Sequence, residues 1–438
     1  MKTYKSVLHL LGLLFVLSIF TTSCDVEDFG NPNAPVAEDL LDGASSADLQ
    51  LLLSGLESVM RNDMAFHFNT VSIVGREYYD LTSVDPRYTG ELLGAQGAGL
   101  DNNGFLTTRA FAQVYRVARN ANNFIAAINN SKAGFSNEEI NGLIAVAQTY
   151  KAYSLLLELT RQNENGIRID VDDVDNPGPF LDYAGSLTAL EAMLDGASGE
   201  LGKAGDAFPL VLSPGLGDMT TPASYTMFNR AIAARVNMYQ GDAQGTKDAL
   251  NASFLDMDGD MNTGAYYVFG ASGNDRTNPL VVVPGQTLFM ATDAFMAGAE
   301  VGDGRLGAKT ADFGSTVELD DLSGSFQVAL YTSNTADVPM VRNEELMLMM
   351  AEANVGSNNA QSITIINKVR AAAGLADYAG GDSDAEVMDA ILYERRYSLF
   401  GEGHYWADMR RMGRFNQIPT ERAGDVVHMQ FPRPVTEG

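Results

Sequence analysis

The sequence has few of the residues that build disulfides, metal sites and nucleic-acid contacts. Its 438 residues include one cysteine, one tryptophan and four histidines. One cysteine excludes an intramolecular disulfide. The chain carries 56 acidic and 29 basic residues, a net charge of −27, and no run rich in lysine or arginine. Such a charge repels polyanions, so it argues against nucleic acid as a partner and against direct binding to anionic lipid headgroups.

Motifs typical of catalytic sites are also missing. His67, His404 and His428 do not have the spacing of metal ligands such as HExxH. The sequence contains neither a GxSxG elbow nor a phosphate-binding P-loop. Paired carboxylates that cleave glycosides are defined by a distance in space, which a sequence does not give. We therefore expect a binding protein without catalytic residues, metal or cofactor.

The single cysteine, Cys24, directly follows a short apolar segment. Lys2 and Lys5 precede an apolar run from Val7 to Phe20, which is too short for a membrane-spanning helix of roughly 20 residues. The segment LSIFTTSC that ends at Cys24 is similar to a lipobox, in which the cysteine is acylated and becomes the first residue of the mature chain. An ordinary cleaved signal with an incidental cysteine is the alternative. We expect a lipoprotein signal peptide at residues 1–23 and lipidation of Cys24.

The segment after Cys24 is acidic and then rich in Gly, Asn and Pro. Asp25, Glu27 and Asp28 are followed by residues 30–35, which do not favour regular structure. We expect a flexible tether at residues 24–36. The acidic run is similar to a signal that sends lipoproteins to the outer face of the outer membrane, although a solvated charge run explains the same residues. Loss of Lys2 and Lys5 with the signal changes the net charge from −27 to −29.

Hydrophobic periodicity predicts long helices on both sides of an irregular region. Apolar residues recur at helical spacing over residues 105–130, 187–201 and 223–239, and Ser136 begins another helix with a capping box. Residues 253–340 are rich in Gly, Asn, Asp and Pro and contain short apolar runs at 266–269, 280–283 and 327–332. Helices resume at Arg342, and Gly374 is placed as a helix stop. The pattern predicts a mainly α, tetratricopeptide-like α–α superhelix with a loop-rich region of short β-strands.

Three alternating aspartates in the loop-rich region have the spacing of a calcium loop. These are Asp256, Asp258 and Asp260. Met261 stands where an EF-hand loop needs glycine, and Tyr267 stands where the bidentate glutamate belongs. We expect a solvated acidic turn instead of a metal site.

The C-terminal part contains four motifs in a fixed order. They are Arg342-x-x-Glu345-x-x-Leu348-x-x-Ala351-Glu352-Ala353, then Ile366-Asn367-x-Val369-Arg370-x-x-Ala373-Gly374-Leu375, then Glu394-Arg395-Arg396, and finally Glu402-Gly403-His404-x-Trp406-x-Asp408-Met409-Arg410-Arg411. Together they resemble the SusD/RagB family of nutrient-binding outer-membrane lipoproteins. Ala372, Ser398, Tyr405 and Arg433 depart from the family's usual residues. The resemblance covers most of the chain and implies one domain over residues 37–438, with a helical part at 37–252, a loop-rich insertion at 253–340 and the motif block at 341–438.

The charged motif residues lie on helices whose other faces are apolar, so we expect them to be paired within the fold. We assign a structural role to the following residues: Arg342, Glu345, Glu352, Arg370, Glu394, Arg395, Glu402, Asp408 and Arg410. Trp406 belongs to the same motif, and we expect it to pack inside the protein and not to serve as a sugar platform.

Sugars bind to aromatic faces flanked by hydrogen-bonding side chains. Two segments have this composition: residues 66–88, which lack the pattern of a clean helix, and residues 266–278. The resemblance implies that ligands lie where non-repeat loops meet the N-terminal helices, which suits both. The candidate ligand residues are Arg76, Tyr78, Tyr79, Tyr88, Tyr266, Tyr267, Asn274 and Arg276.

The resemblance also implies a mechanism of capture and delivery. A lipid-anchored protein on the exterior of the outer membrane would bind an oligosaccharide or polysaccharide and cap a TonB-dependent, SusC-like outer-membrane barrel. Two alternatives stay open: an oligopeptide-binding uptake lipoprotein of the same family, and a tetratricopeptide-like surface scaffold that binds only protein.

Overall fold

The computed structural model describes residues 41, 43–173, 175–273 and 275–437. The expected signal peptide at 1–23, the lipidation site Cys24, the tether at 24–36 and the candidate ligand residue Asn274 lie outside the described residues. Among the helices that are described, none is long and apolar enough to cross a membrane.

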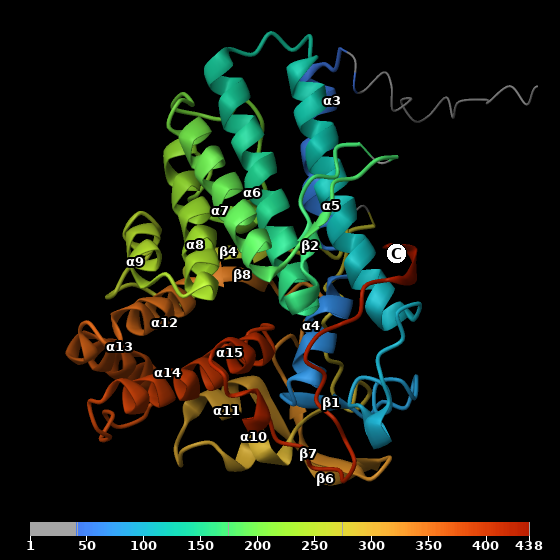
Figure 1. Ribbon diagram of the computed structural model, residues 1–438, viewed down its shortest axis with the longest axis vertical. Coiled ribbons are helices and arrows are strands. Elements are labelled where there is room, and N and C mark those ends of the chain that lie inside the picture. The colour runs from blue at the N-terminus through green and yellow to red at the C-terminus, as the bar shows by residue number, and fades with distance from the viewer. Residues whose placement is uncertain (1–40, 42, 174, 274, 438) are drawn as a thin grey trace, which may run out of the picture.

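Long antiparallel helices form a curved stack in the order of the chain (Figure 1). The N-terminal part contains α3 (Ser46–Val59), α4 (Met64–Val74), α5 (Phe105–Asn129), α6 (Asn137–Gln162), α7 (Tyr183–Leu201), α8 (Pro222–Gln240) and α9 (Ala243–Asn251). The stack continues with α12 (Asn343–Asn354), α13 (Asn359–Ala372) and α14 (Asp384–Ser398), each of which contacts its neighbour. This arrangement confirms the expected tetratricopeptide-like superhelix.

Local signals place several helix ends where the sequence predicts them. The hydroxyl of Ser136 accepts a hydrogen bond from the backbone N–H of Glu139, and the Glu139 carboxylate accepts one from the backbone N–H of Ser136. This capping box satisfies two of the unpaired donors at the start of α6. Gly374, with φ of 78°, follows the end of α13 in a left-handed conformation that glycine adopts readily.

Most of the irregular region forms strands and two short helices that lie below the stack (Figure 1). Strands β1 (Tyr78–Asp80), β5 (Phe289–Ala291), β7 (Leu322–Val328) and β6 (Thr310–Leu319) make an antiparallel sheet in the order β1-β5-β7-β6. Two further pairs are β4 (Gly264–Tyr267) with β8 (Val338–Arg342) and β2 (Ile167–Arg168) with β3 (Phe180–Leu181). Helices α10 (Asp293–Ala297) and α11 (Gly304–Lys309) connect β5 to β6, and α15 (Tyr405–Arg411) follows α14.

The sequence predicted this region only in part. The expected strand at 266–269 overlaps β4, and the one at 327–332 overlaps the end of β7. The run at 280–283 is not a strand, although the backbone N–H of Val282 donates to the carbonyl of Tyr331 at 2.8 Å. The hairpin of β6 and β7 was not predicted, because most residues of β6 are exposed and its apolar residues Phe313, Val317 and Leu319 form no continuous run.

The buried apolar residues divide into two clusters. The larger one fills the helical stack from α3 through α14. The smaller one lies between the sheet, one side of α4, α15 and the C-terminal segment, and it includes Trp406 and Phe431. Helix α4 contributes to both, since Phe68 belongs to the first cluster and Val71 to the second. The fold therefore sets the sheet and its loops against the N-terminal helices.

Candidate functional site

The charged motif residues are buried and paired across elements. Arg235 of α8 donates two hydrogen bonds of 2.7 Å to the carboxylate of Glu345 on α12. Further buried pairs join Arg370 of α13 to Glu394 of α14 (3.0 Å), Arg395 of α14 to Asp408 of α15 (2.7 Å), Arg411 of α15 to Glu352 of α12 (2.7 Å between Nη2 and Oε2), and Arg342 of β8 to Glu402 (2.8 Å). Removal of one partner from such a pair leaves an uncompensated buried charge. The geometry gives these residues a role in holding elements together.

Asp408 receives two guanidinium groups. Although burial alone raises the pKa of Asp408, Arg395 and Arg411 lower it to about 2. The carboxylate therefore stays ionised in the folded protein at any pH above that value. The predicted pairing of Asp408 thus involves two cations, one from α14 and one from its own helix.

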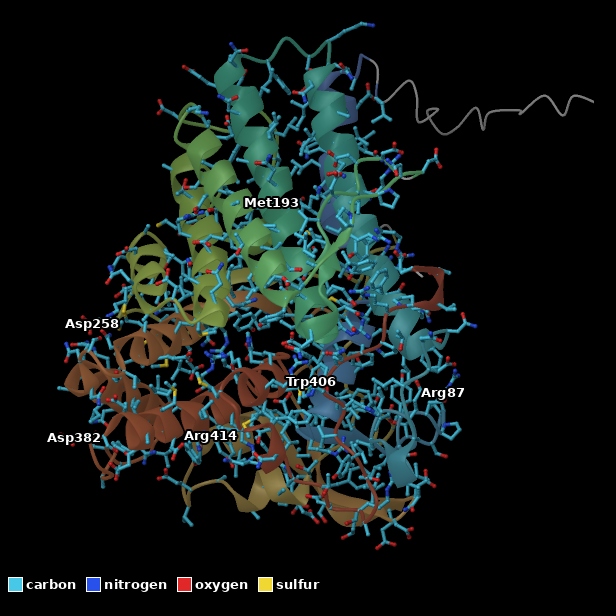
Figure 2. The ribbon with its side chains drawn as sticks, in the orientation of Figure 1. Arg87, Met193, Asp258, Asp382, Trp406 and Arg414 are labelled. Carbon is cyan, nitrogen blue, oxygen red and sulfur yellow. The ribbon has the colours of Figure 1, made fainter. Side chains whose placement is uncertain are left out.

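Trp406 of α15 lies near the centre of the molecule (Figure 2), and Arg410 belongs to the same helix. The Trp406 side chain is buried, and its Nε1 donates to the carbonyl of His428 at 2.9 Å. The guanidinium of Arg410 lies 3.7 Å from the centre of the indole ring and donates to the carbonyls of Met429 and Thr160. Arg410 thus forms no ion pair with any described carboxylate, which corrects the expectation of a charge clamp at this position.

Three candidate ligand residues from the first segment are buried. Arg76 donates to the backbone carbonyls of Ile73, Val74 and Leu93 and lies 3.9 Å from Asp425. Tyr78 and Tyr79 form β1 and belong to the smaller apolar cluster. Because none of the three side chains is accessible to a dissolved glycan, they do not form a binding platform. The segment was also wrongly expected to lack a helix, since residues 66–74 belong to α4.

Tyr88 is the accessible member of the first segment and joins an aromatic patch. The aromatic patch consists of Phe66, Tyr88 and Phe105, all partly buried. Phe105 packs edge-on against Phe66 with ring centres 5.6 Å apart and lies 6.2 Å from Tyr88. Arg87 and Arg109 cover the faces of Phe105 and Phe66 at 4.2 and 4.5 Å. Since these guanidiniums occupy two ring faces, the patch offers a sugar less open surface than its composition suggests.

Tyr266 and Tyr267 point to opposite faces of β4. Tyr267 is buried in the larger apolar cluster, with its ring centre 6.2 Å from that of Tyr153. The alternation of a strand explains this, because successive side chains point to opposite faces. Tyr266 is partly exposed, and Arg276 is exposed on the following loop. Tyr266 is therefore the more exposed of the two tyrosines.

Tyr266 lines a cavity of about 210 Å³ between α3, the turn at Pro214–Leu216 and the segment that follows β4. This cavity, the tyrosine pocket, is lined by Ser54, Glu57, Met60, Arg61, Tyr150, Ser213, Pro214, Leu216, Tyr266, Tyr267, Val268, Asp275 and Met340. Gly215 allows the turn to reach β4, because a Cβ atom at this position would lie 2.0 Å from the Tyr266 carbonyl oxygen. Apolar walls with a few converging polar groups are typical of ligand sites.

The polar groups of the tyrosine pocket are a glutamate and an ion pair. Oε1 of Glu57 accepts hydrogen bonds from the backbone N–H of Ser213 at 2.8 Å and from the Tyr150 hydroxyl at 3.1 Å. Burial raises the pKa of Glu57 to about 7, against the lowering effect of these donors. Oε2 of Glu57 has no hydrogen-bond partner among the described residues, and Glu57 is one of the residues that line the pocket. Asp275 pairs with Arg61 at 2.9 Å at the same pocket.

Sequence reasoning missed Glu57 and Arg61. They lie on α3 and just after it, whereas Tyr266 and Asp275 lie about 200 positions further along the chain. No motif links these segments. A single carboxylate on a helix such as α3 has no sequence signal that separates it from a solvated one.

The three aspartates of the suspected calcium loop do not converge. Asp256 and Asp260 accept hydrogen bonds from nearby backbone N–H groups, and the exposed Asp258 pairs with Lys368 at 2.5 Å (Figure 2). Within residues 43–437, apart from the positions left undescribed, no group of three or more His, Cys, Asp or Glu residues could hold a metal ion.

Comparisons with known proteins agree with the motif resemblance. Residues 323–431 match the model of the SusD family. A SusD superfamily protein from Bacteroides vulgatus has a TM-score of 0.64 at 18% identity, covering 85% of this chain and 89% of that one. Surface glycan-binding protein A from Bacteroides thetaiotaomicron has a TM-score of 0.69 at 12% identity, covering 90% and 96%.

A second structure under the name of surface glycan-binding protein A, in complex with laminarihexaose, has a TM-score of 0.67 at 13% identity and covers 87% of this chain and 93% of that chain. No curated protein matches the chain. The family match over the motif block confirms the predicted SusD/RagB resemblance, and the structural matches extend the shared fold over most of the chain.

Proposed function

Because the chain is a SusD/RagB-like protein, we propose that it binds an oligosaccharide or polysaccharide at the bacterial surface for nutrient uptake. The proposal is supported by two structures of the same fold, both named as surface glycan-binding protein A and one of them in complex with laminarihexaose. The function is binding without a chemical step, and no catalytic residue takes part in it.

The tyrosine pocket is the proposed glycan site, and the open Oε2 of Glu57 is the observation that carries it. A sugar presents apolar C–H faces and hydroxyl edges. The two tyrosines that line the pocket, of which Tyr266 is partly exposed, suit the first, and the carboxylates of Glu57 and Asp275 with Arg61 suit the second. A cavity of about 210 Å³ is smaller than the 300–1,000 Å³ typical of drug-sized ligands. It therefore accommodates one sugar ring or a chain end, with the rest of the glycan on the open surface.

Delivery to a TonB-dependent, SusC-like outer-membrane barrel is the second part of the proposal. Acylation of Cys24 would anchor the protein to the outer membrane with its site toward the exterior. Anchoring confines it to the membrane plane and raises its effective concentration near the barrel. Mass spectrometry of the processed N-terminus tests the anchor, and co-purification of a large barrel protein under mild detergent tests the partner.

A glycan array beside a peptide panel tests the binding function. We expect the full-length protein to bind one class of glycan on the array. The Tyr266→Ala variant is expected to lose this binding. Binding to peptides but to no glycan would favour the oligopeptide-uptake alternative. Binding to neither peptides nor glycans, together with a co-purified protein partner, would favour the scaffold alternative. Either result would contradict glycan binding.

A further inference from the structure

A second polar cleft lies on helices α5, α6 and α7 of the stack. Of these helices, only α6 also contributes to the tyrosine pocket. This amide cleft has a volume of about 490 Å³, and its lining includes Arg119, Asn122 and Asn123 of α5, Gln148 and Lys151 of α6, and Met193 of α7. Met193 lies on the face of the stack that is turned toward the viewer in Figure 2, and α3 lies behind α5 in Figure 1. The residues of α5 recur at spacings of three and four, so they share one side of the helix.

Lys151 is a buried cation in this cleft. Its side chain is 9% exposed, and its Nζ donates to Oδ1 of Asn122 at 2.9 Å. The nearest carboxylate is that of Asp172, 3.7 Å away and 76% exposed. Burial lowers the pKa of Lys151, and Asp172 and Asp170 act in the opposite direction. An ammonium group has three donors, and a single amide acceptor satisfies one of them.

Two further buried atoms in the cleft have no hydrogen-bond partner among the described residues. They are the donor Nδ2 of Asn122 and the acceptor Oε1 of Gln148. A buried polar atom without a partner is unfavourable, because it has lost its hydrogen bonds to water without gaining others. The cleft thus combines a buried cation whose ion-pair partner Asp172 is exposed with a donor and an acceptor that have no partner among the described residues.

The chemistry of the cleft favours a peptide carrying a carboxylate. Arg119 and Lys151 are two cations in a chain of net charge −27, and Arg119 donates to the Asp172 carbonyl instead of a carboxylate. Side-chain amides offer both a donor and an acceptor, as the peptide backbone requires. None of the lining residues is aromatic, and Ile125, Ala126 and Met193 supply the apolar surface. Because sugars prefer aromatic faces, the cleft is less suited to a glycan.

We propose that the amide cleft binds an extended peptide segment and pairs one of its carboxylates with Lys151. The carboxylate would take the position that Asp172 approaches from the β2–β3 loop, and the amides of Asn122 and Gln148 would bond to the peptide backbone. This site is separate from the tyrosine pocket, so the protein binds two classes of ligand on two surfaces.

Fluorescence anisotropy with labelled octapeptides tests this site. The probes are peptides with several Asp and Glu residues, the same peptides with Asn and Gln, and labelled tetragalacturonate as an acidic sugar. Full-length protein is expected to bind the acidic peptides at least tenfold more tightly than the neutral ones, with weaker binding at 200 mM than at 50 mM salt. Lys151→Met is expected to weaken acidic-peptide binding at least tenfold. The matched variant Lys203→Met, which removes an exposed lysine, is expected to leave it unchanged.

The variant Asp172→Asn, at an exposed position, is expected to change the affinity for acidic peptides in the opposite direction. It removes the carboxylate next to Lys151 and is expected to tighten acidic-peptide binding about threefold. Equal binding of acidic and neutral peptides, unchanged binding by a folded Lys151→Met variant, or binding of tetragalacturonate in preference to the peptides would overturn the proposal. Glycan binding measured on Lys151→Met keeps this test separate from that of the tyrosine pocket, because the proposed glycan function expects it to be unchanged.

Discussion

The C-terminal motif block and the tyrosine pocket use charged side chains in different ways. In the motif block, carboxylates such as Asp408 are buried with both oxygens bonded to guanidinium groups. In the tyrosine pocket, Glu57 accepts hydrogen bonds through one oxygen only, its other oxygen has no partner among the described residues, and Asp275 is exposed. Carboxylates with both oxygens hydrogen-bonded, here called saturated charges, stabilise the fold. A carboxylate with an unbonded oxygen can accept a hydrogen bond from a ligand. The strongest sequence motif of this protein therefore identifies its scaffold and not its binding site.

The largest effect is expected from breaking a saturated pair. Asp408→Ala leaves Arg395 and Arg411 buried without their shared carboxylate, so we expect a loss of about 3–5 kcal/mol in the free energy of unfolding. Chemical denaturation measures it. Asp382→Ala, at an exposed aspartate on the loop before α14, is the control and is expected to change stability by less than about 0.5 kcal/mol (Figure 2). A stable Asp408→Ala protein that no longer binds glycan would reverse the roles of the two regions.

The neighbouring residues Tyr266 and Tyr267 test the same difference between binding site and core. Tyr267 is buried, so Tyr267→Ala is expected to lower stability by about 3–5 kcal/mol. Tyr266 is partly exposed at the pocket, so Tyr266→Ala is expected to lower stability far less and to weaken glycan binding about tenfold, or ~1.4 kcal/mol. Thermal unfolding and titration calorimetry on both variants separate the effects. If both variants lost stability equally, Tyr266 would belong to the core and not to the site.

Acid pH is expected to lower the stability that the paired carboxylates of the motif block provide. The pKa of Asp408 is about 2 in the folded protein and about 3.8 in the unfolded chain, so its stabilising effect is present above pH 4 and is lost as the pH falls toward 2. The shift corresponds to about 2 kcal/mol. Denaturation curves between pH 5 and 2 measure it, with Asp408→Asn as the comparison. A stability difference between wild type and Asp408→Asn that stays constant over this range would contradict the assignment.

Glu57 is expected to show the opposite pH dependence. Its pKa is raised to about 7 from 4.5, so the folded state holds this proton more tightly than the unfolded state does. Stability should therefore fall as the pH rises from about 4.5 to 7, and Glu57→Gln should lack this decline. Thermal midpoints at pH 5 and pH 8 test the difference. A midpoint for Glu57→Gln that shifts with pH as the wild-type midpoint does would show that Glu57 has an ordinary pKa.

The sequence predicted those parts of the fold that local signals determine. The capping box at Ser136 and the glycine at 374 mark helix ends through nearby hydrogen bonds and backbone conformation, and the structure has both. The burial of Tyr78 and the exposure of Tyr266 depend on which neighbours cover each strand, and those neighbours come from distant segments. A composition rich in aromatic residues cannot separate these cases. For the same reason Glu57 and Arg61 were not predicted as site residues.

The central claim is that a glycan binds at the tyrosine pocket, and titration calorimetry tests it most directly. The glycan that the array selects is titrated into full-length wild type, Tyr266→Ala and the Asp382→Ala control. We predict equal affinities for wild type and Asp382→Ala, and binding about tenfold weaker for a folded Tyr266→Ala protein. Equal affinity for all three proteins would contradict the account.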